Sequence, residues 1–524
     1  MFFNAKTAWR SAWAAVSMKC FNAAAPGAAA LARRAGMAKG RSPLRPWPCG
    51  RSAAAAAAAT LALIALAGCA TPSTESGFGV LEQAAQAHLG KTLAWPRSDS
   101  ERAAVDARVA ELLAQPLSVD AAVQIALLNN RGLQASFDQL GIADADRVQA
   151  GLLPNPGVRF GRLRQGHGAA ETTEIDRSIT FDLGRLLTLP LARQIEDQRF
   201  EATRGAALMS VLSLAAQTRA AYYSAVAADE TRRYMLQVQV AAEAGAELAR
   251  RQLQAGNWNE LQQAREQGFH ADAALNLARA EQGRVAAREQ LARLLGLWGT
   301  QTDFQLPDRL PDLPAQPNDL PDIERTAMAQ RVDVQAARLD SDRLARALDL
   351  TRTTRFINLL ELGAQRNSHS DAPVERGFEI SIELPLFDWG TSRVAKAEAI
   401  YMQSVNRAAD LAVNARSEVR LAYANYRTSH DIARRFRDEI VPLKKRISEQ
   451  NLLRYNGMLI GVFELLADAR SQITTVNGYI EALRDFWLAQ SALDSVQIGP
   501  APLGVLAPAK APVMSVTGGV AAAH

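Results

Sequence analysis

The residues of this sequence that are suited to bond chemistry are few and scattered. Its six histidines lie far apart, and its three cysteines, Cys20, Cys49 and Cys69, all fall near the N-terminus. The local patterns of zinc proteases, phosphate-binding loops, serine hydrolases and dinucleotide-binding folds do not occur in it. The sequence therefore predicts no catalytic residue, no metal site and no cofactor, and it argues against an enzyme.

Cys69 is different, because its surroundings predict a specific modification. A basic flank ending at Arg51 precedes a mostly apolar run, 53–67, which is shorter than the roughly 20 residues of a membrane-spanning helix. This pattern is typical of a secretory signal. The segment Leu66-Ala67-Gly68-Cys69 resembles a bacterial lipobox, whose cysteine is acylated (palmitate is one such chain) and becomes the new N-terminus. By analogy with known lipoproteins, Ala70 in place of aspartate permits sorting to the outer membrane.

The charge of the chain is unevenly distributed. Residues 1–68 hold nine lysines and arginines and no acidic residue, so cleavage before Cys69 changes the formal net charge from +5 to −4. The basic balance therefore belongs to the targeting segment. A nucleic-acid partner loses its main support for the same reason.

The chain repeats itself at a spacing of 201 residues. With that shift, Arg219-Ala-Ala-Tyr222 aligns with Arg420-Leu-Ala-Tyr423, and Ile179-Thr-Phe-Asp-Leu183 aligns with Ile380-Ser-Ile-Glu-Leu384. The same shift serves from Gln134 to Gly256 without a gap. We interpret this constant register as an internal duplication.

The duplication and the prolines divide the chain into segments. Five prolines between Pro307 and Pro321 exclude a continuous helix there. The predicted segments are a leader (1–68), a lipid-anchored N-terminal segment (69–116), a first repeat (117–300), a proline-rich linker (301–317), a second repeat (318–499) and a tail predicted to be disordered (500–524).

Helices are predicted at both ends of each repeat. Each repeat begins with one, at about 118–150 and about 320–353, and two strands follow it. Residues from about Phe200 to Ala255 are good helix formers and predict a helix of roughly 80 Å. Its counterpart in the second repeat contains Pro442, which predicts a kink or break.

Two glycines mark the positions where these long helices should turn back. Gly256 and Gly457 are 201 residues apart, and glycine adopts the left-handed conformation of a helix end at low cost. Return helices are predicted to reach about Gly296 and Gln497. Each repeat therefore predicts a long antiparallel hairpin with coiled-coil packing.

The predicted strands alternate between apolar and polar residues. They are about 157–162, 174–183, 357–365 and 377–386. In the second strand Ile179 and Phe181 share one face, which Arg177 interrupts. This alternation is typical of a transmembrane β-barrel, and it also describes a half-buried soluble strand. Four strands cannot close a barrel, and open edges are not tolerated in lipid. Either the sheet is soluble or several chains share one barrel, which the lipid anchor favours.

Three short motifs follow one another along the duplicated chain. They are Leu153-Pro-Asn-Pro156, Ser381-Ile-Glu-Leu-Pro-Leu-Phe-Asp-Trp-Gly390, and Tyr455-Asn-Gly457 followed by Leu465-Leu466-Ala467-Asp468-Ala469. Each is weak alone, but their order and spacing are specific. Over about 117–498 the chain resembles the TolC-type family of outer-membrane efflux proteins.

The resemblance implies an α+β membrane protein that forms a homotrimer. Each of the three chains would give four strands to one transmembrane β-barrel, and the long helices would form a periplasmic barrel. The implied function is that of a passive conduit in a tripartite efflux pump, which exports small molecules or metal ions across the outer membrane. The implied partners are a periplasmic adaptor and an inner-membrane transporter, the latter of the resistance-nodulation-division type.

Carboxylates beside the predicted turns are candidates for a gate. Glu260, Glu464 and Asp468 follow Gly256 and Gly457, and in a trimer each becomes a ring of three charges. Such rings attract cations and resist closure unless they are paired. Ordinary solvated helix residues fit the same pattern.

An uncharged gate is the alternative. Some members of the family carry an aspartate ring at this place, and Phe463 and Leu466 fall near where those aspartates align. A hydrophobic constriction also gates a channel, by expelling water.

The polar face of the strands is predicted to line the barrel lumen. Its carboxylate candidates are Asp182, Glu361, Glu379 and Glu383, which would tune the selectivity of the pore. This assignment depends on the register of the strands.

Two other functions are consistent with the same segments. One is a channel for type I protein secretion, against which the lipid anchor argues. The other is a periplasmic lipoprotein whose helices form a structural coiled coil, which predicts no stable trimer and leaves the alternating strands unexplained.

Overall fold

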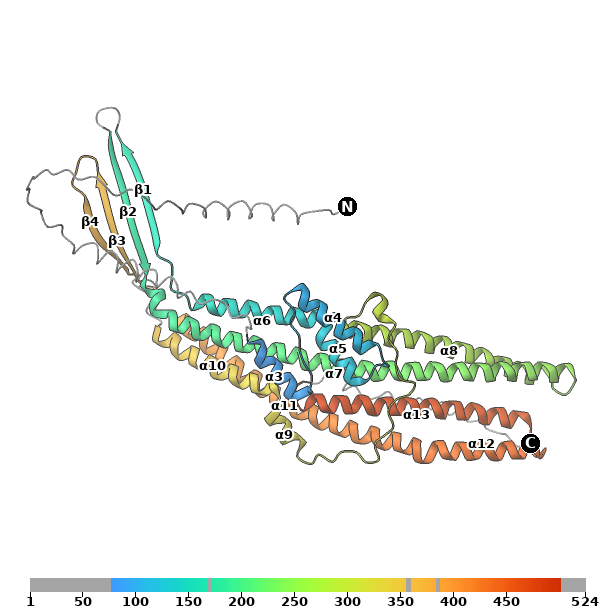
Figure 1. Ribbon diagram of the computed structural model, residues 1–524. Coiled ribbons are helices and arrows are strands. Elements are labelled where there is room, and N and C mark those ends of the chain that lie inside the picture. The colour runs from blue at the N-terminus through green and yellow to red at the C-terminus, as the bar shows by residue number, and fades with distance from the viewer. Residues whose placement is uncertain (1–76, 167–170, 355–359, 383–386, 501–524) are drawn as a thin grey trace, which may run out of the picture. The chain divides into compact units, whose positions relative to one another are not determined.

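The computed structural model describes residues 77–166, 171–354, 360–382 and 387–500 (Figure 1). These residues all belong to the compact unit Cys69–His524. The leader, Cys69 and the tail from residue 501 lie outside the described ranges. Within those ranges, no helix combines the length and the apolar character that crossing a membrane requires.

The strands form one antiparallel sheet with the order β1-β2-β3-β4 (Figure 1). They are β1 (Gly157–Gln165), β2 (Thr172–Asp182), β3 (Leu360–His369) and β4 (Glu375–Ile382). Ile179 of β2 lies opposite Ala364 of β3, so strands from both halves of the chain share the sheet. The predicted strand residues 357–359 and 383–386 lie outside the described ranges.

The longest helix, α7 (Leu183–Gln254), continues directly from β2. Its 72 residues extend roughly 110 Å at 1.5 Å per residue. The sequence predicted this helix only from about Phe200, and that start was wrong. Asp182 caps the true start by accepting a hydrogen bond of 2.7 Å from the backbone N–H of Arg185. Pro190 lies inside the helix, where it removes one backbone hydrogen bond.

The first hairpin is completed by α8 (Glu260–Leu295), which packs along α7 (Figure 1). Asn259 and Gln262 form a reciprocal capping box at its start. Its end is followed by Gly296 with a φ of 68°, close to the predicted end.

The second hairpin contains one interruption. It consists of α11 (Thr391–Arg435), the π-helical turn Phe436–Ile440, α12 (Val441–Asn456) and the return helix α13 (Val462–Val496). The break predicted at Pro442 is this π-helical turn. Because proline has no N–H, the carbonyl four residues earlier lacks its helical donor, and the turn widens.

Corresponding elements of the two halves occupy equivalent positions. The ends of α8 and α13, Leu295 and Val496, are 201 residues apart, which is the spacing of the sequence repeat. The same spacing separates the starts of α6 (Arg131–Ala150) and α10 (Val332–Thr354). These ends match the spacing of the sequence repeat, although the π-helical turn and α12 follow α11 in the second half where α7 is continuous in the first.

The helix predicted at the start of each half is in fact two helices. The elements there are α5 (Val119–Asn129), α6, α9 (Ile323–Gln330) and α10. A single extended residue separates each pair, Asn130 in the first half and Arg331 in the second. The Asn130 side chain accepts a hydrogen bond from the N–H of Leu133 and donates one to the carbonyl of Leu294. These bonds offset those that the break removes.

The break at Arg331 is stabilised by charge. Its guanidinium is fully buried and lies 2.6 Å from a carboxylate oxygen of Asp333 and 2.9 Å from one of Glu418. Glu418 belongs to α11, so this cluster fixes α10 against the second hairpin. The two carboxylates neutralise the charge of the buried guanidinium and accept hydrogen bonds from most of its N–H groups.

The main apolar core lies where the two hairpins meet the shorter helices. It includes residues of α3 (Phe78–Leu89) and α4 (Asp99–Leu113), which fall in the predicted N-terminal segment. Tyr222 is buried in this core, and its hydroxyl donates a hydrogen bond of 2.9 Å to the carbonyl of Leu117. Burial raises the pKa of the Tyr222 phenol to about 12. This residue therefore has a packing role.

Candidate functional sites at the helical turns and on the sheet

The two hairpins turn back with different residues in the left-handed conformation. Gly256 has a φ of 75° between α7 and α8, as predicted. Between α12 and α13 the helix ends at Asn456, directly before Gly457, as predicted. The left-handed conformation expected of Gly457 is wrong, because its φ is −81° and Met458 has a φ of 56° instead. The N–H of Leu459 donates to the carbonyl of Arg454, which closes the turn one residue later than predicted.

Two of the predicted gate carboxylates lie in the first turns of the return helices. Glu260 is the first residue of α8, and Glu464 lies in the first turn of α13. Glu464 accepts a hydrogen bond of 3.2 Å from the N–H of Gly461, so it caps the helix. Both side chains are exposed. Negative charge at these helix ends is favourable because of the helix dipole.

The third predicted carboxylate, Asp468, is mostly buried. Only 9% of the residue is exposed, and its Oδ2 has no hydrogen-bond partner among the described residues. Asp468 follows Glu464 by four residues on α13, about one helical turn, so these two carboxylates lie on the same side of that helix. Glu260 belongs to the other hairpin, at the start of α8.

The predicted uncharged alternative is only partly described. Leu466 lies against α7, with its Cδ2 at 3.8 Å from the position that a Cβ atom on Gly245 would take. Nothing can be derived for Phe463, because its side chain lies outside the described part of the chain.

A buried ion pair near the turns was not predicted. Glu266 of α8 is 1% exposed and lies 2.7 Å from the guanidinium of Arg470 on α13. The guanidinium carbon of Arg470 also lies 4.4 Å from the centre of the Phe269 ring. No local pattern of the sequence predicts this pair, because its members belong to different halves.

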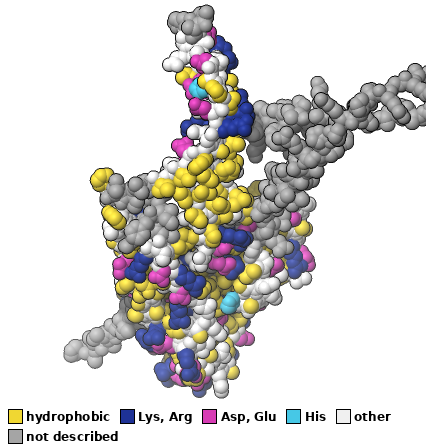
Figure 2. All heavy atoms as spheres, turned by 90° about the vertical axis from the view of Figure 1, so that its left-hand side faces the viewer, with side chains coloured by type: hydrophobic (Ala, Val, Ile, Leu, Met, Phe, Trp, Pro, Cys, Tyr) yellow, Lys and Arg dark blue, Asp and Glu magenta, His cyan; other side chains and the backbone are white. Residues whose placement is uncertain are grey.

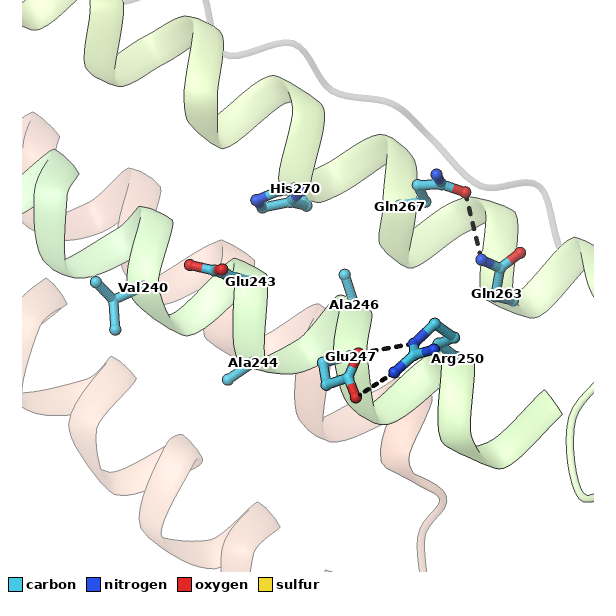
Figure 3. A pocket seen from close by; sticks show the side chains of 9 residues that line it. All are labelled: Val240, Glu243, Ala244, Ala246, Glu247, Arg250, Gln263, Gln267 and His270. Atoms are coloured by element: carbon cyan, nitrogen blue, oxygen red, sulfur yellow. Dashed lines mark hydrogen bonds and ion pairs between the residues drawn. The ribbon is translucent and has the colours of Figure 1, made fainter. Parts of the chain in front are cut away.

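A polar groove of about 610 Å³ lies between α7 and α8 (Figure 3). Glu243 and His270 face it from opposite helices, and Arg250 binds Glu247 at its edge (Figure 3). Hydrogen bonds from Arg250 and Arg251 lower the pKa of Glu247 to about 2, so this carboxylate is ionised at neutral pH. Among the described residues, no cluster of His, Cys, Asp and Glu is suited to a metal ion.

The sheet places the predicted lumen carboxylates on one face. Asp182 lies opposite Glu361, and Glu379 lies opposite Gly363, two residues farther along β3. Residues directly opposite or two apart share a face of a sheet, so these three carboxylates are neighbours. Glu383 lies outside the described ranges. Asp182 also caps α7, a role that the alternation alone did not indicate.

Comparison with known proteins identifies one curated relative. No protein-family model matches the chain. The cobalt-zinc-cadmium resistance protein CzcC of Cupriavidus metallidurans is 24% identical over 283 residues, which cover 52% of this chain. The matched region spans 64% of the length of CzcC.

Solved structures of outer-membrane channels resemble the chain over most of their length. CusC, whose structures concern transmembrane channel formation, is 18% identical with a TM-score of 0.61, covering 73% of this chain and 92% of its own. The MtrE outer-membrane channel of Neisseria gonorrhoeae is 19% identical with a TM-score of 0.61, covering 73% and 89%. VceC of Vibrio cholerae, an outer-membrane protein, is 14% identical with a TM-score of 0.60, covering 73% and 96%. The chain therefore has the fold of these outer-membrane channels, as the resemblance of its sequence to the TolC-type family implied.

Proposed function

We propose that the chain is the outer-membrane channel subunit of a tripartite efflux pump, a passive conduit without bond chemistry of its own. One observation carries the proposal. A sheet with an exposed apolar face continues directly, through Asp182, into α7, a helix of roughly 110 Å that forms one arm of the first hairpin. The apolar face suits lipid, and the hairpins suit a tunnel through the periplasm.

The apolar face of the sheet is unusual for a soluble protein. Its exposed members are Val158, Phe160, Ile179, Phe181, Phe378, Ile380 and Ile382. In Figure 2 hydrophobic side chains gather where the sheet meets the helices. A contiguous patch of this kind marks an interaction surface or an aggregation hazard in water, but it is the normal outer face of a transmembrane barrel.

The edges of the sheet support a trimer. In the described sheet, β1 and β4 are edge strands, each with one neighbour. Lipid does not tolerate their unpaired backbone groups, and four strands are too few to close a barrel. Pairing of β4 with β1 of a second copy, repeated around a threefold axis, removes every edge. We therefore propose a homotrimer with one shared barrel.

An internal duplication accounts for the two hairpins. The matching element ends, such as Leu295 and Val496, support it together with the sequence repeat. In a trimer the two hairpins of each chain would supply six similar units around a tunnel. Because the two hairpins are similar, the contacts between hairpins of one chain and those between hairpins of neighbouring chains can use the same packing geometry.

The polar face of the sheet favours cations as cargo. It carries Asp182, Glu361 and Glu379, together with Glu174 and Asp176 on the alternating positions of β2. Carboxylates lining a pore select for cations. The name of CzcC, cobalt-zinc-cadmium resistance protein, agrees with a divalent metal cargo. We propose metal cations as the first class of substrate to test, ahead of uncharged small molecules.

The remaining parts of the assembly follow from the same proposal. The turns at Gly256 and Met458 would meet a periplasmic adaptor and an inner-membrane transporter of the resistance-nodulation-division type. Cys69 would carry the lipid anchor of the mature chain in the outer membrane. Glu464 and Asp468 remain the proposed gate carboxylates, each contributing a ring of three.

Conductance in planar bilayers tests the channel and its gate together. The purified protein is compared with Glu464→Gln and Asp468→Asn, and Glu449→Gln on the exposed surface of α12 serves as the control. We expect discrete conductance steps in all four, with altered conductance or cation preference only in the two gate variants. Steps that neither variant changes would retain the channel and reject these carboxylates as its gate.

The other candidate functions predict different results. A structural coiled-coil lipoprotein would give neither a stable trimer in detergent nor conductance. A type I secretion channel would conduct, but its deletion would abolish export of a protein and leave metal tolerance unchanged. Growth of a deletion strain on zinc, cobalt or cadmium salts separates a metal-efflux channel from a secretion channel. Growth of the same strain carrying the Cys69→Ser variant tests whether the proposed lipid anchor is needed.

A further inference from the structure

Three arginines stand side by side across the sheet, one on each of β2, β3 and β4. Arg177 is directly opposite Arg366, which is directly opposite Arg376. Side chains in such positions share a face and have Cβ atoms about 4.5–5.5 Å apart. Phe160 of β1 completes the row, and its ring centre lies 6.0 Å from the guanidinium carbon of Arg177. Arg177, Arg366 and Arg376 are called the arginine row below.

The positive charge extends along β1. Arg162 and Arg164 follow Phe160 on the same face, toward the β1–β2 connection. These two and the arginine row are all exposed. Among the five, and counting only partners within the described ranges, Arg164 alone forms an ion pair, with Glu171 at 3.5 Å.

This arrangement lacks its counter-charge. Like charges directly opposite on neighbouring strands repel, so the arginine row is unfavourable by itself. Guanidinium groups bind phosphate through two parallel hydrogen bonds, which a row of three can offer to more than one phosphate oxygen. A bound phosphorylated group would therefore relieve the repulsion.

The row also marks a boundary on its face of the sheet. Toward the helices the same face is apolar, and Phe181 lies roughly 14 Å along β2 from Arg177. Figure 2 shows basic side chains farther along the sheet than the hydrophobic ones. On a lipid-facing strand, arginine is costly at the middle of the bilayer and nearly neutral at the headgroups. The row therefore fits the level of the headgroups.

A hollow joins the charged and apolar parts of this face. Its volume is about 440 Å³, and its lining includes Phe160, Arg177, Ile179, Ala364 and Arg366. It offers an anion site at one side and an apolar surface at the other.

We propose that the arginine row binds the phosphate groups of an anionic lipid headgroup in the outer leaflet of the membrane. The acyl chains of that lipid would lie along the apolar face between the row and the helices. The inference rests on the proposed function, because it needs the sheet to stand in the outer membrane. A phosphorylated lipid matches both the charge and the apolar surface, whereas free phosphate matches only the charge.

Native mass spectrometry of the full-length protein in detergent tests the proposal. The probes are diphosphoryl lipid A, the same lipid without phosphates, and inorganic phosphate as a competitor. The variants are R177Q/R366Q/R376Q, the charge-retaining R177K/R366K/R376K, and a control that removes three exposed helical arginines, R265Q/R279Q/R446Q.

We expect the wild type and the control to bind diphosphoryl lipid A and to prefer it to the phosphate-free lipid. The triple glutamine variant should bind it roughly a hundredfold more weakly, because three cations near an anionic headgroup are lost. The lysine variant should keep part of the affinity. Inorganic phosphate should not displace the lipid at equal concentration.

Equal binding of diphosphoryl lipid A by the wild type and the triple glutamine variant would overturn the proposal, as would equal binding of the two lipids by the wild type. If the triple variant does not form trimers, Arg366→Gln at the centre of the row replaces it, with an expected loss of about fivefold. Conductance in phosphatidylcholine bilayers is measured in parallel. Conduction by all variants keeps the channel function intact whatever the lipid result, and absence of conduction in the wild type would reject that function itself.

Discussion

The carboxylate of Glu266 and the guanidinium of Arg470 form an ion pair of 2.7 Å that joins the two halves of the chain near their turns. Glu266 is buried, whereas 36% of the Arg470 side chain is exposed. Phe269 lies beneath the guanidinium, and Tyr234 and Ile473 pack with it around a small apolar cluster. The two hairpins are therefore fixed to each other by both charge and packing at this level.

Removal of the buried carboxylate should weaken the contact between the hairpins. We expect Glu266→Gln to lower the free energy of unfolding by about 1–3 kcal/mol, because Arg470 loses its charged partner but keeps access to water. Thermal unfolding of the detergent-solubilised protein measures the change. The double variant E266Q/R470Q should recover part of the loss.

A more exposed pair provides the matched control. Arg232 of α7 and Glu281 of α8 lie 4.0 Å apart, with 33% and 52% of their side chains exposed. Glu281→Gln should change stability by no more than about 0.5 kcal/mol. If Glu266→Gln lowers the free energy of unfolding as little as Glu281→Gln does, the buried pair does not stabilise the contact between the hairpins.

Glycine should be the favoured residue at the left-handed position of both turns. Met458 adopts the left-handed conformation, which costs an L-residue roughly 1–2 kcal/mol, so Met458→Gly should stabilise the chain by about 1 kcal/mol. Gly256→Ala should destabilise it by a similar amount, because Gly256 has a φ of 75°. Gly457→Ala is the control, since its φ of −81° suits alanine. Chemical denaturation of the three variants measures these effects, and a large cost for Gly457→Ala would contradict the assignment of Met458.

The sequence predicts features that depend on local pattern, and misses those that depend on tertiary contacts. Alternation located the strands, and the prolines and glycines located the interruption before Pro442 and the turn at Gly256. The break at Asn130 was missed because its compensation includes a hydrogen bond to Leu294, distant in sequence. The early start of α7 was missed because a proline such as Pro190 is unusual inside a helix, whereas the Asp182 cap lies upstream of it.

The same distinction between local pattern and tertiary contact holds for the functional sites. Alternation predicted the polar side of its own strand for each of Asp182, Glu361 and Glu379, because period-two alternation is a local property. The register of the strands then makes the three carboxylates neighbours. Local pattern did not pair Glu266 with Arg470, since the approach of α8 to α13 is set by packing of whole helices. It also treated Arg177 only as an interruption, because its neighbours Arg366 and Arg376 depend on strand register.

The stability of the chain should depend on pH in two opposite ways. Burial raises the pKa of Asp494, and Arg219 offsets this only in part. Its folded-state pKa therefore lies above the ordinary 3.8, so stability rises as the pH falls through the folded-state pKa toward that value. Asp494→Asn should be more stable than the wild type at neutral pH, and the difference should disappear below about pH 4.

Asp438 supplies the opposite case in the same experiment. A hydrogen bond from Arg437 lowers its pKa, so its contribution is present above the ordinary value and is lost as the pH falls through the folded-state pKa. Asp438→Asn should be less stable than the wild type at neutral pH, with the difference shrinking in acid. Thermal unfolding of the three proteins from pH 3 to pH 8 checks both signs. A loss of stability in Asp494→Asn at neutral pH would show that its carboxylate is paired rather than desolvated.

The charge of the sheet's polar face should set the ion preference of the channel. Glu361 and Glu379 lie on that face, and neither is needed as a helix cap, unlike Asp182. Replacing both with glutamine removes two carboxylates per chain without changing side-chain size. We expect the ratio of cation to anion permeability to fall severalfold, measured as the reversal potential in a salt gradient across a planar bilayer. Asp371→Asn, in the exposed β3–β4 connection, is the control and should change the ratio much less. If the double variant conducts with an unchanged ratio, the acidic face does not line the lumen, and the exposed apolar face would have to be reassigned with it.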